Sequence, residues 1–361
     1  MTKSTKICGW GRYPQQDAYL HTPTSCTSLE LIAKHQNSVL ARGMGRSYGD
    51  SANALNVLQT RYINHFIKFD KATGKLTAEA GITLREILEV IVPSGWFLPV
   101  TPGTSYATLG GAIASDVHGK NHHIAGTFGQ YVMSLNILLG TGEVVTTSSQ
   151  HHTDLFHATC GGMGLTGIIM SATIQLLPIR SSLISQKTIK ADCIEAACEA
   201  FESNRDATYS VAWIDCLSKG KSLGRSVIKL GEHFEQGGLE IDTRQKVSVP
   251  FSTPSVLLNS LTMKVFNTAY WHKSKNNVSQ TVGLMPYFYP LDAVGEWNRL
   301  YGKKGFVQFQ CVVPKLDGVA NMRRLLTEIS SSGEGSFLAV LKQFGIANEN
   351  LLSFPTEGYT L

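Results

Sequence analysis

The chain has 361 residues, of which 43% are hydrophobic and 16% charged, a composition typical of a globular protein rather than a disordered one. The formal net charge is +5 without a dense Lys/Arg run, which argues against nucleic-acid binding but suits an anionic small substrate or a membrane surface. Seven cysteines without a CxxC pair argue against a disulfide framework or a zinc knuckle. The N-terminal residues lack a signal-peptide core, and no apolar run approaches the ~18 residues that span a bilayer. We therefore expect a soluble or peripheral cytoplasmic protein.

The first half of the chain predicts a succession of short helices and strands. Helical spacing or a glycine stop marks three helices, at 29–35, 83–92 and 154–162. Apolar and β-branched runs mark strands at 38–43, 76–81 and 165–178. Two such runs flank a Gly-Thr-Gly turn at 135–148, which is typical of a hairpin. We expect a mixed α+β domain over residues 1–180.

The second half predicts an antiparallel sheet backed by helices over residues 181–361. Alternating runs predict its strands, at 207–215, 226–231, 306–314 and 337–345. Helical spacing with a glycine stop predicts a helix at 317–333. Residues 234–280 lack clear periodicity and allow two interpretations, a long surface connection or a mobile, lipid-facing lid.

Three glycine clusters lie in the first half. "ARGMGRSYGD" (41–50) follows a strand, and its glycines allow consecutive backbone N–H groups to converge on an anion. It is neither the GxGxxG of a dinucleotide fold nor a P-loop, and such glycines also occur in ordinary turns. Further clusters occur at 102–119 and 161–174. Three glycine loops in one domain favour one large ligand with a pyrophosphate and a planar ring.

The segment "ASDVHGKNHH" (114–123) holds His118, His122 and His123. His118 and His122 are four residues apart, as in a helical zinc pair. Gly119 and Asn121 are poor helix formers, however, and no glutamate follows His118 as the general base of a zinc hydrolase. We expect no metal site here, and we expect His122 and His123 to support the turn.

Seven segments resemble, in the same order, the decaprenylphosphoryl-β-D-ribose 2′-oxidases, which are flavoproteins of the vanillyl-alcohol oxidase/p-cresol methylhydroxylase type. They are "GWGR" (9–12), "ARGMGRSYGD", "GGAIASDVHGKNHH" (110–123), "GGMGLTGIIMSATI" (161–174), "LDAVGEWNRLYG" (291–302), "GFVQFQCVVP" (305–314) and "LLSFP" (351–355). The resemblance is weak over 179–205 and 234–280. It implies a two-domain α+β flavoprotein, with a PCMH-type FAD-binding domain followed by the substrate domain.

The resemblance also implies which residues hold FAD. The first loop matches the segment that wraps the pyrophosphate: Ala41, Arg42, Gly43, Met44, Gly45, Arg46, Ser47, Tyr48, Gly49, Asp50 and Ser51. The second region matches segments lining the pyrophosphate and the ring: Gly103, Thr108, Leu109, Gly110, Gly111, Ser115, Asp116, Val117 and His118. Ile169 matches a backbone contact. Relatives in the wider superfamily attach the flavin to a histidine in the first loop, which has none here, so we expect FAD to be bound non-covalently.

The implied reaction is oxidation of a secondary sugar alcohol to a ketone, with a polyprenyl-phosphoryl pentose oxidised at its 2′-hydroxyl. The implied substrate contacts are His118, Gly119, Lys120, Gln308, Gln310, Lys342 and Phe344. Candidate catalytic residues are His118, Tyr48 and Lys342, and the ordinary pKa values of ~6.5 for histidine and ~10 for tyrosine favour His118 as the base. The competing interpretations are a solvated strand face for Gln308 and Gln310 and a surface position for Lys342.

The resemblance breaks at the end of the chain. In the family a further strand with a cysteine follows, then a lysine and a tyrosine that face the flavin, so we expect a chain truncated at Leu361. Thr360 stands where the family tends to have asparagine. Implied partners are a separate NAD(P)H-dependent reductase and a peripheral contact with the inner membrane face. The alternatives are an oxidase of free sugars, alditols or aldonolactones, and an inactive truncated chain.

Overall fold

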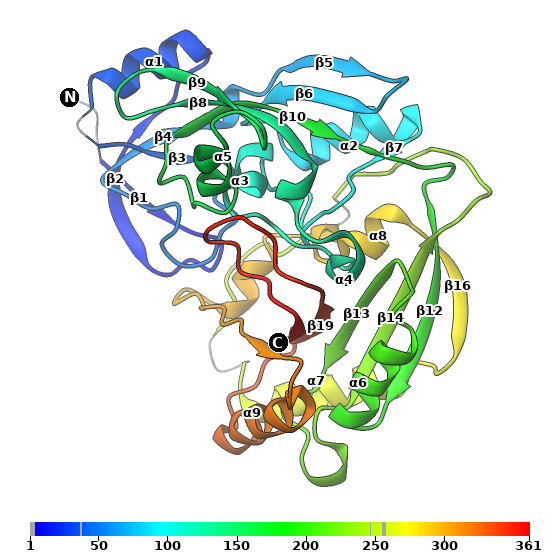
Figure 1. Ribbon diagram of the computed structural model, residues 1–361. Coiled ribbons are helices and arrows are strands. Elements are labelled where there is room, and N and C mark those ends of the chain that lie inside the picture. Colours follow the sequence, from blue (N-terminus) through cyan, green and yellow to red (C-terminus); the bar gives the residue numbers. More distant parts are fainter. Residues whose placement is uncertain (1–3, 37, 246, 255–257) are drawn as a thin grey trace.

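The computed structural model describes residues 4–36, 38–245, 247–254 and 258–361, and mixes helices with largely antiparallel sheets in an α+β arrangement (Figure 1). Among these residues no helix is both long enough and apolar enough to cross a membrane. The sheets divide by sequence. Those built before residue 180 lie at one end of the molecule in Figure 1, and the large sheet built after it lies at the other.

The first sheet has the order β1-β2-β4-β3 and places the first glycine loop. Its strands are β1 (Thr5–Cys8), β2 (Gln15–His21), β4 (Asn56–Gln59) and β3 (Leu40–Arg42). β4 lies parallel to both β2 and β3, and α1 (Cys26–Lys34) makes the crossover from β2 to β3. β3 confirms the strand expected at 38–43. The glycine loop begins where it ends.

The second sheet has the order β5-β6-β10-β8-β9 and is antiparallel throughout. Its strands are β5 (Phe66–Asp70), β6 (Lys75–Glu79), β10 (Ile168–Gln175), β8 (Val132–Leu138) and β9 (Val144–Thr147). β8 and β9 are the hairpin expected at 135–148, and β10 is the β-branched strand expected at 165–178. The associated helices are α2 (Leu84–Ile91), α3 (Leu109–Ala114), α4 (His122–Ala125) and α5 (Thr153–Thr159). β7 (Trp96–Phe97) pairs with β11 (Leu177–Pro178) beside this sheet.

The third sheet comes entirely from residues after 180 and has the order β16-β12-β14-β13-β19-β20-β18. Its strands, all antiparallel to their neighbours, are β16 (Val278–Gly283), β12 (Leu183–Ala191), β14 (Ser226–His233), β13 (Tyr209–Ile214), β19 (Val340–Phe344), β20 (Gly358–Thr360) and β18 (Val312–Pro314). α6 (Ile194–Ser203) and α9 (Gly318–Ser332) pack on it, with Ile194, Phe201, Met322 and Leu326 in the shared core.

The strand expected at 306–314 is wrong over most of its length. Only β18 (Val312–Pro314) is a strand, and the backbone from residue 306 to 311 is irregular. A segment of alternating apolar and polar residues forms a strand only where a neighbouring strand pairs with its backbone N–H and C=O groups. Here Phe306 donates to Gly11 and Cys311 pairs with Leu361, while Val307 and Phe309 between them are 69% and 77% exposed. Gln308 and Gln310 therefore do not share a strand face.

The long connection expected at 234–280 is wrong where the structure has α7 (Ser260–Lys273). Its buried residues Met263, Asn267 and Trp271 recur every four positions, which is helical spacing. An asparagine within this buried stripe, and exposed apolar residues outside it, hide the pattern in the sequence. The region also contains β15 (Val247–Ser248), which pairs with β17 (Val294–Gly295), and the start of β16. Residues 255–257 of the expected lipid-facing segment lie outside the described residues.

The main hydrophobic core crosses the boundary at residues 180/181. Phe288 of α8 (Leu284–Phe288) lies 4.9 Å from the Phe97 ring and 4.8 Å from the Tyr209 ring, measured between centroids. Tyr289 is also in this cluster and bonds Thr101 through its hydroxyl at 2.5 Å. The large sheet is thus attached to the first half through apolar side chains of β13 and α8. This attachment sets where β19 meets the histidine segment.

Candidate active site

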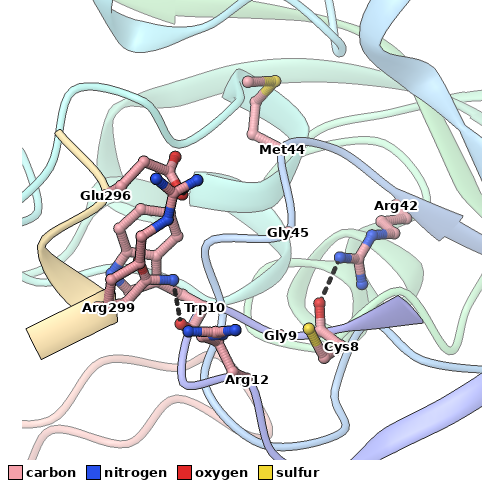
Figure 2. A pocket seen from close by; sticks show the side chains of 10 residues that line it. Cys8, Gly9, Trp10, Arg12, Arg42, Met44, Gly45, Glu296 and Arg299 are labelled. Carbon is pink, nitrogen blue, oxygen red and sulfur yellow. Dashed lines mark hydrogen bonds and ion pairs between the residues drawn. The ribbon is translucent and has the colours of Figure 1, made fainter. Parts of the chain in front are cut away.

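The first glycine loop, residues 41–51, is held from within by Arg42. Its Nη1 donates to the Ala52 carbonyl at 2.8 Å and to Asn53 Oδ1 at 3.0 Å, and its Nη2 donates to the Cys8 carbonyl at 2.6 Å (Figure 2). Gly45 and Gly49 have φ values of 61° and 66°, which side chains other than glycine adopt at a cost. The Arg42 side chain therefore shapes the loop.

Two donors in this loop are buried and have no hydrogen-bond partner among the described residues, Arg46 Nε and Ser47 Oγ. The Arg46 guanidinium lies 3.9 Å from the Trp10 ring centroid and 4.5 Å from that of Tyr106, and burial lowers its pKa. Burying unpaired donors is costly unless a ligand accepts from them. A cation and a hydroxyl set in a glycine loop are the donors that a pyrophosphate needs.

The second glycine region lies directly against the first. A Cβ on Gly43 would come within 2.3 Å of Thr108 Oγ1, so only glycine allows this approach. Thr108 caps α3 by accepting from the Gly111 amide at 3.1 Å, while Gly110 donates to the Ala80 carbonyl and Leu109 is fully buried. A Cβ on Gly49 or Gly103 would meet nothing within 4 Å, which leaves room at both places. The two regions predicted from sequence are thus adjacent, and they suit FAD.

The other predicted cofactor residues occupy varied positions. Ala41 is in β3, Met44 lines a cavity, and Asp50 and Ser51 are exposed at the end of the loop. Ser115 ends α3, and Val117 follows it and bonds Ala112 and Phe128 through its backbone. Ile169 lies in β10, paired with Ile137, and is 6% exposed.

Asp116 is buried with φ at 38°, and its carboxylate bonds other parts of the protein. Oδ1 accepts from the Gly129 amide at 2.7 Å. Oδ2 accepts from Asn348 and Asn350, both at 2.8 Å, and from Ser353 at 2.7 Å. The Asp116 side chain therefore ties residues 348–353 to the segment before His118.

A cavity of about 310 Å³ adjoins the first loop (Figure 2). Its lining joins that loop to two other motifs: Cys8, Gly9, Trp10 and Arg12 from "GWGR" and its neighbour, Arg42, Met44 and Gly45 from the loop, and Glu296, Asn298 and Arg299 from "LDAVGEWNRLYG". Asn298 Nδ2 donates to the Trp10 carbonyl at 2.9 Å and holds the two motifs together. Sequence reasoning did not assign these seven flanking residues to the site. Their concentration of Trp, Gly and Arg in two motifs was the available signal.

His118 is the centre of a second group of predicted residues. Lys342 Nζ lies 3.5 Å from His118 Nδ1, and Gln310 Nε2 lies 3.3 Å from His118 Nε2. The Phe344 ring meets the imidazole edge-on at 4.7 Å between centroids. Lys342 and Phe344 reach it together because they are two apart on β19 and so point to the same side. Gln310 also donates to Thr360 Oγ1 at 3.0 Å.

Burial sets the proton affinities in this group. Desolvation first, and then the charge of Lys342, hold the pKa of His118 well below its ordinary value, so the imidazole is neutral at neutral pH. Burial also lowers the pKa of Lys342 to about 8. Burial raises the pKa of Tyr48 to about 12, so its hydroxyl stays protonated and is a weak base near neutrality. The site thus has a neutral imidazole beside an amine that titrates near physiological pH.

The remaining predicted substrate residues differ in their placement. Lys120 Nζ donates to the Tyr287 carbonyl and lies 4.4 Å from the centroid of the Tyr287 ring. Burial holds the pKa of Lys120 well below its ordinary value. Gly119 packs against Asn121 and Thr101. Gln308 is exposed and Tyr48 packs on Phe306 at 5.6 Å, so the described structure brings neither to His118. His122 Nδ1 accepts from the Gly345 amide, and His123 Nε2 lies 2.9 Å from the Ala207 carbonyl oxygen.

Comparison with known proteins agrees with this geometry. Residues 24–148 match the protein family described as an FAD binding domain. The chain is 36% identical to the decaprenylphosphoryl-β-D-ribose oxidase of Mycolicibacterium smegmatis, over 100% of this chain and 82% of the relative. It is 29% identical to an uncharacterised protein of Streptomyces coelicolor, over 78% of this chain and 80% of the relative. It is also 29% identical to the L-gulonolactone oxidase of Scyliorhinus torazame, over 42% of this chain and 34% of the relative.

The chain thus combines this identity along its entire length with two adjacent glycine regions, the first of which leaves buried donors for an anion. The protein is therefore an FAD-dependent oxidoreductase and belongs to the decaprenylphosphoryl-β-D-ribose oxidase family.

Proposed function

We propose that the protein oxidises the 2′-hydroxyl of a polyprenyl-phosphoryl-β-D-ribose to the ketone. The observation that carries this proposal is the group around His118, in which an imidazole, an amine and an amide converge two residues from the Asp116 turn. The hydride-accepting chemistry of this oxidation would be supplied by FAD when it is bound. The similarity to the Mycolicibacterium oxidase along the whole chain supports this substrate.

The chain's own residues would bind the sugar and move the hydroxyl proton. The neutral His118 imidazole accepts the hydroxyl hydrogen bond, and neutral Lys342 is the stronger of the two bases. When Lys342 is protonated, its charge opposes protonation of His118. When it is neutral, that repulsion is absent. Gln310 orients a neighbouring sugar hydroxyl, and Phe344 covers the ring. Gly119 and Lys120, which directly follow His118, would complete these contacts, whereas exposed Gln308 and Tyr48, which packs on Phe306, are not brought to His118.

The cofactor would be held without a covalent bond. Residues 41–51 contain no histidine or cysteine that could form one, and Arg46 and Ser47 offer the pyrophosphate their unpaired donors. The remaining contacts are those of Ala41–Ser51, Gly103, Thr108–Gly111, Ser115–His118 and Ile169. Denaturation should release all of the flavin into the supernatant. Flavin that stays with the precipitated chain would contradict this part of the proposal.

The proposal includes a division of labour and two partners. Residues 1–180 would hold FAD, and residues 181–361 would bring Gln310, Lys342 and Phe344 to the sugar beside His118. The ketone would pass to a separate NAD(P)H-dependent reductase that completes an epimerisation. The protein would work in the cytoplasm, in peripheral contact with the inner membrane face, where a polyprenyl lipid resides.

Reduction of the bound flavin without oxygen tests the substrate. Farnesyl-phosphoryl-β-D-ribose should bleach the flavin absorbance in a single turnover, whereas its 2′-deoxy analogue should not. L-Gulono-1,4-lactone tests the aldonolactone alternative, which the resemblance to L-gulonolactone oxidase raises. Faster bleaching by the lactone than by the lipid sugar would contradict the proposal.

His118→Ala should slow bleaching about 100-fold or more while leaving FAD affinity nearly unchanged, because the imidazole acts on the sugar. His123→Ala is the matched control, since among the described residues the His123 ring has one hydrogen bond, to the Ala207 carbonyl. It should bleach at close to the wild-type rate. An unchanged rate in His118→Ala would remove His118 from the mechanism.

A further inference from the structure

Helix α7 (Ser260–Lys273) exposes apolar residues and buries a polar one. Leu261, Val265 and Phe266 are 69%, 63% and 46% exposed, whereas Asn267 is fully buried. A surface helix of a globular protein normally turns its apolar side chains toward the core. Figure 1 places α7 at the end of the molecule opposite α1. The outward side of α7 therefore differs from an ordinary solvated helix face.

The orientation of α7 is set by specific contacts on its inner side. Asn267 Nδ2 donates to Asp215 Oδ1 at 2.8 Å, and Arg225 forms an ion pair with the same carboxylate at 2.8 Å. The Trp271 ring lies beneath Lys190 Nζ at 4.2 Å and the Arg225 guanidinium at 5.5 Å. These buried polar contacts would be lost if the helix rotated to hide Leu261 and Val265. The apolar face is thus held outward.

The stretch of sequence that contains α7 carries positive charge and no negative charge. No Asp or Glu occurs between Asp242 and Asp292, although the chain has 27 acidic residues. Lys264 and Lys273 lie on α7, both exposed, and Lys275 follows it. Long lysine side chains can keep their ammonium groups in the headgroup region while apolar neighbours insert. This combination suits an anionic lipid surface better than a water-facing or acidic one.

A row of aromatic contacts leads from this face back to the cofactor loop. Phe266 meets Phe337 at 5.5 Å, and Phe337 stacks on Tyr301 at 5.4 Å between centroids. Tyr301 stacks on Phe306 at 4.1 Å, and Phe306 lies 5.6 Å from Tyr48. The exposed face and the first glycine loop are therefore joined through apolar side chains.

We propose that Leu261, Val265 and Phe266, flanked by Lys264 and Lys273, form a docking face by which the protein binds an anionic membrane. We call this set the α7 face. The proposal rests on the proposed function, because a polyprenyl-phosphoryl sugar is presented at a membrane. Docking through α7 would bring the aromatic row, and hence the site, toward the lipid that carries the substrate.

Co-sedimentation with vesicles tests the α7 face without measuring turnover. Vesicles of equal parts phosphatidylcholine and phosphatidylglycerol should bind the flavin-loaded wild-type protein, and pure phosphatidylcholine should bind it much more weakly. Leu261→Ser with Val265→Ser should weaken binding about tenfold or more through lost apolar insertion. Lys264→Gln and Lys273→Gln should each weaken it about fivefold, and raised salt should have a similar effect.

The matched controls are Leu31→Ser and Lys34→Gln, on the exposed side of α1 at the other end of the molecule. Both should bind vesicles as the wild type does. Equal vesicle binding by the α7 and α1 variants would overturn the proposal. Wild-type protein that binds vesicles with and without phosphatidylglycerol equally well would overturn it too. A dimer that the α7 variants dissociate would identify the face as a self-association surface instead.

Flavin reduction by the water-soluble farnesyl substrate, measured on the same variants, should be unchanged. That result separates the two ideas: lost vesicle binding with normal reduction supports the α7 face, and lost reduction in the wild type contradicts only the proposed function.

Discussion

At the scale of single residues, the chemistry of the site follows from burying His118 and Lys342 together. A neutral imidazole has one lone pair to offer, and two nitrogen groups lie within 3.5 Å of its ring nitrogens. If Nε2 accepts from Gln310, Nδ1 carries the hydrogen and faces an acceptor only when Lys342 is neutral. The protonation state of Lys342 therefore decides which His118 nitrogen carries the hydrogen.

This arrangement predicts a rise in turnover with pH, with a midpoint at about 8. Below this pH Lys342 is protonated, so it is not a base and its charge lowers the basicity of His118. Above a pH of about 8 Lys342 is neutral, so it can act as a base and its charge no longer lowers the basicity of His118. Turnover should therefore increase with pH. The pH profile of flavin reduction, without oxygen and with saturating farnesyl substrate, is the measurement.

Lys342→Met removes the group that titrates, so its rate should be lower and nearly independent of pH between about 7 and 9. Lys187→Met, on the exposed side of β12, is the matched control and should keep the wild-type profile. A wild-type rate that falls through this range would show that the protonated amine is the required form.

At the scale of elements, the turn between α3 and α4 depends on residues far away in sequence. One carboxylate oxygen of Asp116 accepts hydrogen bonds from Asn348, Asn350 and Ser353, and the other accepts from the Gly129 amide. Gly345 at the end of β19 bonds His122 on the other side of the same turn. The loop after β19 is thus fastened at both ends, and this fixes the distance from Lys342 and Phe344 to His118.

Asp116→Asn should lower the free energy of unfolding by about 2–4 kcal/mol and reduce turnover, since an amide would present N–H groups to the donors around it. Asparagine tolerates the left-handed backbone at this position, so the effect isolates the hydrogen bonds. Urea unfolding measures the first effect and flavin reduction the second. Asp206→Asn, an exposed aspartate, is the control. Equal stability of the two variants would show that Asp116 contributes little to holding the segment.

At the scale of the whole molecule, one apolar cluster joins the sheets of the two halves. Phe97, Tyr209 and Phe288 come from β7, β13 and α8, and all are almost completely buried. A shared core of this kind couples the unfolding of its parts. The relative position of cofactor loops and sugar residues is then a property of the folded whole.

We therefore expect one cooperative thermal transition, followed by both circular dichroism and flavin fluorescence. Phe288→Ala should lower the stability by about 3–5 kcal/mol and move both signals together, because the cavity opens in the shared cluster. Phe66→Ala, on the exposed part of β5, should move neither by much. Two separate transitions, with only one shifted by Phe288→Ala, would show that the halves unfold independently.

Elements with local signals could be predicted from the amino-acid sequence. The hairpin β8–β9, the strand β10 and the pair Lys342 and Phe344 on one side of β19 follow from periodicity and turn residues, because backbone hydrogen bonding imposes those repeats nearby in the chain. The glycine loops were also visible, since glycine marks backbone that other residues cannot adopt. The assignment of these loops to FAD, and of the residues around His118 to the sugar, came from the family resemblance and stays a prediction.

Three features depend on long-range contacts and could not be predicted. Gln310 rather than Gln308 reaches His118, Asp116 accepts hydrogen bonds from distant asparagines, and residues 260–273 form a helix with its apolar side outward. The alternation in 306–314 was real, but a strand needs a partner, and within this segment only residues 312–314 pair with β20. The helix α7 was concealed because its buried face includes an asparagine whose partner, Asp215, lies 52 positions away in sequence. Contacts between segments far apart in the chain leave no local repeat, and they decide the site.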